Sequence, residues 1–63
     1  MDEHIFINVE EASEIMHICK DNVRKLARQP GFPAIKIGKR YIIDKNKLYQ
    51  WMEEHLGREV IIE

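Results

Sequence analysis

The fold is decided by the stretch HICKDNVRKLAR, which runs from residue 17 to residue 28. Val23, Leu26 and Ala27 follow the i, i+3, i+4 spacing of one helical face, and charged side chains take most other positions. A Pro-Gly pair follows closely and ends the helix, because proline disfavours a helical conformation at the residue before it. We therefore predict a helix over about Lys20–Arg28.

A second helix is predicted just before this one, at about residues 9–16. Asn8 is a good N-cap, and Glu11 lies three residues later, where its side chain can reach back as in a capping box. Residues 17–19 then form a short turn in which Ile18 is expected to point inward. Two helices joined by so short a turn must cross steeply and share one core, which is the helix-turn-helix arrangement.

The segment after these helices predicts a β-hairpin. Residues 34–43 alternate with a period of two around a turn that starts at a glycine, and a lysine and an arginine lie at its tip. We expect Ile35 and Ile37 to face inward together with Tyr41 or Ile43. The hairpin would then cover the core and present its basic tip to solvent.

A third helix is predicted at about residues 45–55, with Asp44 as its cap and Gly57 as its stop. Its buried face is expected to carry Leu48, Trp51, Met52 and Leu56. Residues 5–7 lead into the first helix as an extended, packed segment. The tail at residues 58–63 has a strand-like composition without a clear place in the fold.

Charge is distributed unevenly along the 63 residues, although the formal net charge is only −1. Residues 1–19 carry five acidic side chains and no Lys or Arg, whereas residues 20–47 carry nine Lys or Arg and two Asp. Residues 48–63 are acidic again. Because salt screens charges beyond about 8–10 Å, a local basic surface matters more for nucleic-acid binding than the total charge.

Several classes of protein are disfavoured by the composition. The single Cys19 allows neither an internal disulfide nor a multi-cysteine metal site, and a lone thiol fits a reducing cytoplasm. The acidic N-terminus is unlike a signal peptide, and no apolar run exceeds three residues, so we expect no membrane span. The three histidines match no zinc spacing, and Ser13 has no triad around it. We expect no cofactor, no metal, no small-molecule substrate and no catalysis.

The order of these segments resembles the excisionase-type helix-turn-helix family, a branch of the MerR-like winged helix proteins. The resemblance covers about residues 6–56 and rests on NVEEA at 8–12, ICKDNV at 18–23, PAIKIGKRY at 33–41 and LxxW at 48–51. It implies an α+β fold, mainly α: a small winged helix-turn-helix with three helices and a two-stranded β-hairpin wing. It also implies binding of duplex DNA, with the second helix in the major groove and the wing tip on the backbone or minor groove.

The sequence departs from this family at two positions. Cys19 stands where the family usually has serine, so the second helix lacks a strong oxygen cap. Ile42 stands on the wing where the family often has arginine, which removes one phosphate contact. Both departures weaken the resemblance locally.

Within this resemblance, residues near the start of the second helix would approach base edges. Lys20 and Arg24 suit guanine, and Asn22 suits adenine, although all three also fit an ordinary solvated helical face. Asp21 is expected to favour the helix dipole or to orient a neighbouring Arg or Lys. The phosphate contacts, which position the protein without reading sequence, are expected from Lys25, Arg28, Lys36, Lys39 and Arg40.

Four more residues have two possible interpretations each. Tyr41 can pack its ring while its hydroxyl meets a phosphate. Lys45 and Lys47 oppose the dipole of the third helix, and either a bound phosphate or simple solubility accounts for them. Trp51 fits core packing better than base stacking.

Three functions remain open at this stage, all for a chain that reads as one domain over residues 1–63. The first is an excisionase-like recombination directionality factor of a mobile element, which binds double-stranded DNA and recruits a site-specific recombinase (integrase) or further copies of itself. The second is a transcriptional regulator or its DNA-binding module. The third is a protein-interaction module in which the flexible or partner-binding tail at residues 58–63 adds a strand to a partner. The DNA site, its bending and the isomer of the bond before Pro33 stay open.

Overall fold

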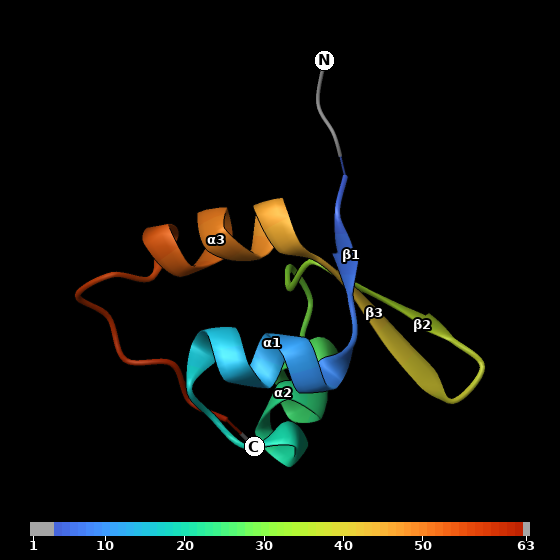
Figure 1. Cartoon of the computed structure of the whole chain (residues 1–63). Helices are drawn as coiled ribbons and strands as arrows, with labels where there is room; N and C mark the ends of the chain where they lie inside the picture. The colour runs from blue at the N-terminus through green and yellow to red at the C-terminus, as the bar shows by residue number, and fades with distance from the viewer. Residues whose placement is uncertain (1–3, 63) are drawn as a thin grey trace.

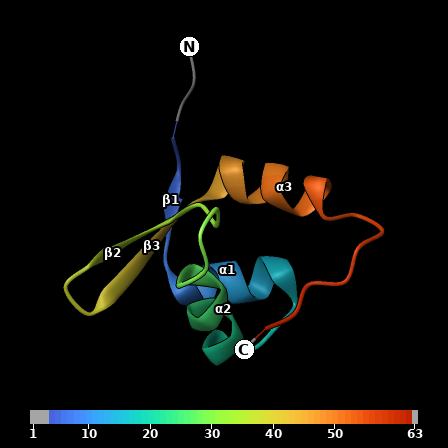
Figure 2. The same cartoon turned by 180° about the vertical axis from the view of Figure 1, so that it is seen from behind.

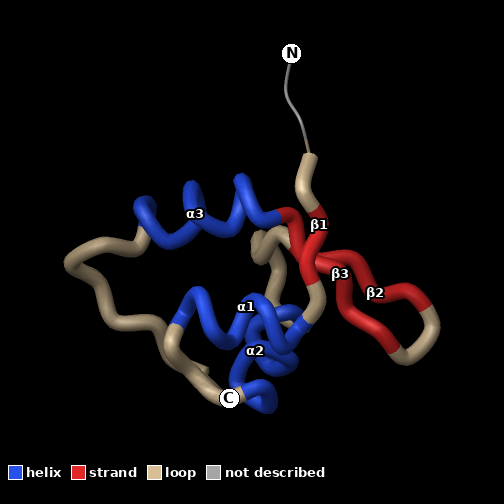
Figure 3. Tube along the Cα trace, viewed as in Figure 1, coloured by secondary structure: helices blue, strands red, loops and turns tan. Residues whose placement is uncertain are grey.

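The computed structural model describes residues 4–62, and in that part of the chain three helices pack beside a three-stranded antiparallel sheet (Figure 1). The elements follow in the order β1 (Phe6–Ile7), α1 (Val9–Met16), α2 (Lys20–Ala27), β2 (Ala34–Ile37), β3 (Arg40–Asp44) and α3 (Lys45–Glu54). Figure 3 shows the helices gathered on one side and the β2–β3 hairpin projecting away from them. This architecture is the small winged helix-turn-helix that the sequence predicts.

The start and end of α1 are determined by residues next to it in the chain. The side chain of Asn8 accepts a hydrogen bond from the backbone N–H of Glu11, and the Glu11 carboxylate accepts one from the backbone N–H of Asn8. This capping box confirms the predicted start. His17 ends the helix in the left-handed conformation, with a φ of 57°.

Cys19 is the N-cap of α2, and its side chain makes no capping hydrogen bond. Val23 and Leu26 are buried on its inner face, and the helix ends at Ala27, one residue before the predicted end at Arg28. The missing cap follows from the replacement of a hydroxyl by a thiol, which is a weak hydrogen-bonding group. The prediction that this helix lacks a strong oxygen cap is confirmed.

The strand β3 lies at the centre of the sheet, between β1 and β2. Ile43 pairs with Ile7 on one side and with Ala34 on the other, and all three face the helices. The segment expected only to lead into α1 therefore adds a third strand to the predicted two-stranded wing. Gly38 opens the hairpin turn with a φ of 60°, which matches the glycine-first pattern of a type II′ turn.

The prediction that Ile35 and Ile37 face inward is wrong, because their side chains are 53% and 61% exposed. The two-residue turn pairs Ile37 with Arg40 and Ile35 with Ile42, so both isoleucines share a face with those partners and not with Ile43. Side chains alternate between the faces of a sheet, and a register shift of one residue therefore moves a whole strand to the opposite face.

The core lies between the helices and the inner face of the sheet. Its buried apolar residues are Ile7, Ala12, Val23, Leu26, Phe32, Ile43 and Leu48. Trp51 is half-buried, and its ring contacts Phe32 edge-on at 5.0 Å between centroids and stacks on His55 at 4.1 Å. These contacts support the core-packing interpretation of Trp51.

The end of α3 differs from the prediction. The helix ends at Glu54, and the chain turns through Gly57, which has a φ of 78°. Leu56 lies in this turn and is 76% exposed, so the prediction that it is buried is wrong. The prediction assumed that the helical spacing continues to Leu56. Because α3 ends two residues before it, Leu56 does not lie on the inner face of the helix.

The tail packs against the domain. Val60 and Ile62 pack against the core, and the Gln29 side chain donates a hydrogen bond of 3.1 Å to the backbone oxygen of Ile61. Figure 2 shows the tail leaving α3 and returning beside α2. The bond before Pro33 is trans. Within residues 4–62, no helix has the length and apolar character needed to cross a membrane.

Candidate nucleic-acid interface

The outer face of α2 is basic. Its Lys20, Arg24 and Lys25 side chains are exposed, and Arg28 continues the face at the C-terminal cap. Because Val23 and Leu26 anchor the opposite face in the core, these cations must project into solvent. Asn22 is half-buried, so it is the least accessible of the three residues expected to read bases.

The hairpin supplies a second group of cations. Lys36, Lys39 and Arg40 are all exposed, and Tyr41 is half-buried. Lys36 lies across the strands from Tyr41, with its Nζ 5.9 Å from the centre of the ring. At this distance the ammonium group can interact with the ring face. The Tyr41 ring is therefore covered in part by a neighbour on the same hairpin.

A cleft brings the helix and the hairpin together. Its volume is about 320 Å³. It is lined by Arg24 from α2 and by Lys39, Arg40 and Tyr41 from the hairpin. The start of α1 and Ile42 complete its walls. Cations that are fifteen residues or more apart in the chain thus border one concave surface, where their fields add.

The other predicted residues lie outside this cleft. Lys20 lines a neighbouring cleft, which Arg24 also borders, so this part of α2 joins the two. Lys47 instead borders clefts beside Phe32 and Pro33, next to α3. Lys45 is half-buried at the start of the same helix. The structure therefore groups Arg24 with the hairpin and separates Lys47 from them.

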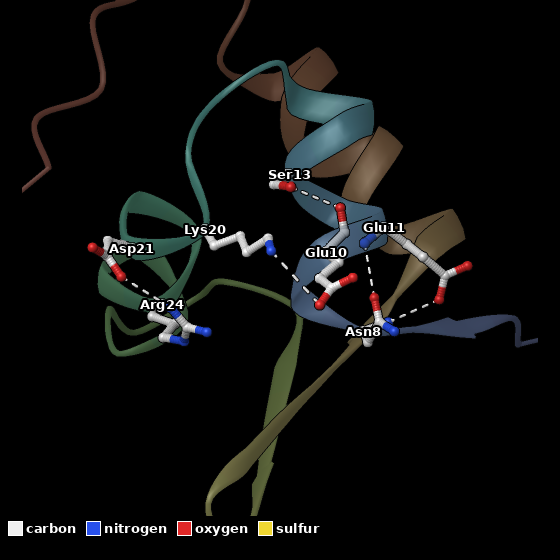
Figure 4. A network of polar contacts seen from close by, with 7 residues as sticks. All are labelled: Asn8, Glu10, Glu11, Ser13, Lys20, Asp21 and Arg24. Carbon is white, nitrogen blue, oxygen red and sulfur yellow. Dashed lines mark hydrogen bonds and ion pairs between the residues drawn. The ribbon is translucent and has the colours of Figure 1, made fainter.

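Two of the α2 cations have acidic partners (Figure 4). Nη1 of Arg24 donates to Oδ1 of Asp21 at 2.9 Å, and Nζ of Lys20 lies 3.7 Å from Oε1 of Glu10. The first contact confirms that Asp21 orients a neighbouring arginine. The second contact joins α1 to α2, and the sequence analysis did not predict it.

Sequence reasoning missed Asn8, Glu10 and Ile42 as residues of the cleft wall. The Asn8 side chain was recognised only as a cap, and Ile42 only as a departure from the wing pattern. Glu10 lies in the first turn of α1 and Lys20 in the first turn of α2, and the packing of the two helices brings these side chains together although they are ten residues apart in the chain. No local pattern in the sequence contains that crossing geometry.

Comparison with known proteins identifies a family for this chain. Neither a search of curated proteins nor a search of solved structures found a similar chain. A family model described as a helix-turn-helix domain matches residues 6–56, which include every helix and strand named above. The match covers the crossing helices, the hairpin and α3 in one alignment, and the chain therefore belongs to the helix-turn-helix domain family and is a DNA-binding protein of that kind.

Proposed function

We propose that this protein is an excisionase-like recombination directionality factor of a mobile element. It binds duplex DNA near a recombination site, inserts α2 into the major groove and rests the hairpin tip on the backbone or in the minor groove. The observation that carries this proposal is the shared cleft, in which Arg24 of α2 faces the same space as Lys39 and Arg40 of the hairpin. A helix fits the major groove, and a cationic loop beside it suits the adjacent phosphates.

Each cation takes a role from its place in the fold. Lys20, Asn22 and Arg24 lie in the first half of α2 and would approach base edges. Lys25 and Arg28 lie further along the helix and, with the hairpin cations and the Tyr41 hydroxyl, would meet phosphates. Lys45 and Lys47, at the start of α3, would meet phosphates only if the DNA extends past the hairpin. No catalytic residue is assigned.

The DNA surface of this domain is small. It consists of one helix and one hairpin within the matched residues 6–56, and Val60 and Ile62 of the tail pack onto the same core. One recognition helix and one wing read only a few base pairs, so useful specificity requires several copies on adjacent sites or a recombinase that binds beside them. Either arrangement would bias the direction of recombination.

The DNA surface is tested by titrating isotope-labelled protein with a 20-base-pair duplex of mixed sequence at two salt concentrations. We expect amide shifts over Lys20–Arg28 and Lys39–Tyr41, and an affinity that falls with a log–log slope of roughly −4 to −5 for about five phosphate contacts. Shifts that are absent, or scattered and insensitive to salt, would exclude these residues as the interface.

The role in recombination is tested with a candidate integrase encoded next to this chain. We expect the protein to stimulate the excisive reaction on a supercoiled substrate and to leave the integrative reaction unchanged or slower. If the protein does not change the yield of excision but changes transcription from a nearby promoter, the chain is a transcriptional regulator.

A further inference from the structure

Lys20 and Glu10 form an ion pair between the first turns of α2 and α1, with 3.7 Å between Nζ and Oε1 (Figure 4). Their side chains are 52% and 69% exposed, so both remain in contact with solvent. Lys20 is therefore not a free cation on the surface of α2. Its charge is held beside a carboxylate from another helix.

Glu10 is set apart from the other acids of α1. Glu11 is used in the capping box, and the side chain of Glu14 makes no hydrogen bond or ion pair with any of residues 4–62. Glu10 alone of the three lines the cleft that Arg24, Lys39 and Arg40 border. A carboxylate thus lies within the surface that the proposed function assigns to DNA, where it repels phosphates.

The two kinds of DNA contact respond differently to such a pair. Attraction to phosphates depends on net charge and is independent of sequence, so a lysine paired with a carboxylate contributes little to it. A base edge accepts hydrogen bonds, and the lysine ammonium has three donors, so one can stay with Glu10 while another reaches guanine O6 or N7. The pair therefore lowers generic attraction more than it lowers base recognition.

We propose that Glu10 is a specificity-determining residue that acts by positioning Lys20, holding it for a base edge and away from phosphates. This inference rests on the DNA-binding function proposed above and names the residue that limits binding to unrelated sequences. Glu10 is a positioning residue because it acts through Lys20. Its contact with Lys20 is exposed and correspondingly weak, so the effect is a modest bias and not a lock.

The test compares Glu10→Gln with Glu14→Gln, which removes the same charge from the same helix without touching Lys20. Each change is also made in a Lys20→Gln background. Affinities are measured over a series of salt concentrations for two duplexes, one of mixed sequence and one recovered from a random pool by selection with the wild-type chain. Both glutamate side chains are exposed, and the bond that Ser13 donates to Glu10 uses the backbone oxygen, so we expect the variants to fold.

We expect Glu10→Gln to bind the mixed duplex about two- to fivefold more tightly than Glu14→Gln does. Its log–log salt slope should be steeper by up to about 0.9, because Lys20 then pairs with a phosphate. The affinity for the selected duplex should rise less, so the ratio of the two affinities falls. In the Lys20→Gln background, the difference between the two glutamate variants should disappear.

Two results would overturn the inference in distinguishable ways. If the wild type binds duplex DNA but the two glutamate variants behave alike, or their difference persists without Lys20, the role of Glu10 is wrong and the proposed function stands. If the wild-type chain binds neither duplex, the proposed function fails and the inference fails with it.

Discussion

Nδ1 of His4 lies 2.5 Å from Oδ2 of Asp44, forty residues away in the chain. Asp44 ends β3 and caps α3, and its other carboxylate oxygen accepts a hydrogen bond of 3.2 Å from the backbone N–H of Lys47. The Asp44 side chain is only 10% exposed. One carboxylate therefore ties the chain ahead of β1 to the start of α3.

The hydrogen bond from His4 is the main reason why the pKa of Asp44 is lowered, and bonds from the backbone of Lys47 and Asn46 add to the effect against the opposing effect of burial. A carboxylate with a lowered pKa stabilises the fold above the pKa of the unfolded chain, about 3.9, and this contribution is lost as the pH falls through the lower folded value. We expect the urea midpoint to decline below about pH 4 for this reason.

Asp44→Asn tests this expectation because asparagine is also a good N-cap but does not ionise. We predict a lower urea midpoint than the wild type at pH 7 and a shallower decline below about pH 4. Glu14→Gln, at an exposed position, serves as the control and should keep the wild-type decline. Equal acid sensitivity of Asp44→Asn and the wild type would show that this carboxylate does not govern acid unfolding.

Arg40→Gln is predicted to weaken binding to duplexes of any sequence. Arg40 borders the cleft between α2 and the hairpin, so its loss should reduce the magnitude of the log–log salt slope by about 0.9. Arg58→Gln removes the same charge from the exposed tail and should leave the slope unchanged. Fluorescence anisotropy over a range of salt concentrations measures both. Equal effects of the two variants would point to net charge and not to a local contact.

Cys19→Ser is predicted to stabilise the domain. Cys19 occupies the N-cap position of α2 with an extended backbone, φ −73° and ψ 159°, but without a capping bond from its side chain. A serine hydroxyl at that position can accept from a backbone N–H of the first turn, which contributes about 1 kcal/mol. Thermal unfolding measures the gain. Cys19→Ala is the control, and a gain of equal size in this variant would exclude capping as the cause.

Leu48→Ala is predicted to destabilise the domain severely, because Leu48 is fully buried in the core. Such a change typically costs about 2–5 kcal/mol, a large part of the roughly 3–9 kcal/mol expected for a domain of this size. Leu56→Ala makes the same change eight residues later, beyond the end of α3, where Leu56 is 76% exposed, and should cost less than about 0.5 kcal/mol. Chemical denaturation measures both, and similar costs would contradict the position of Leu56 outside the core.

Val60→Ala and Ile61→Ala test whether the tail stabilises the domain through the side chains that pack against the core. Val60 packs against the core, whereas the Ile61 side chain is 67% exposed and only its backbone oxygen is bonded to Gln29. We predict a loss of about 1 kcal/mol for Val60→Ala and almost none for Ile61→Ala, again by chemical denaturation. If neither change affects stability, the tail does not contribute to the domain and is free for a partner.

The sequence by itself determined the elements whose signals lie within a few residues of one another. The Asn8–Glu11 capping box, the apolar stripe of α2 and the Asp44 cap of α3 are local, so the helices could be predicted to within about one residue. The basic side chains of α2 and the hairpin could be named for the same reason. Helical and strand periodicity places such residues on a face without knowledge of the rest of the chain.

Only the tertiary structure decided which faces and partners those elements have. The outward position of Ile35 depends on hairpin register, and the pairing of β1 with β3 brings together residues nearly forty positions apart. The Lys20–Glu10 and His4–Asp44 contacts depend on how separate elements cross. A local pattern shows which residues of an element share one face. Which face is buried, and which strands pair, depends on how all the elements pack around one small core, and a short stretch of sequence does not contain that information.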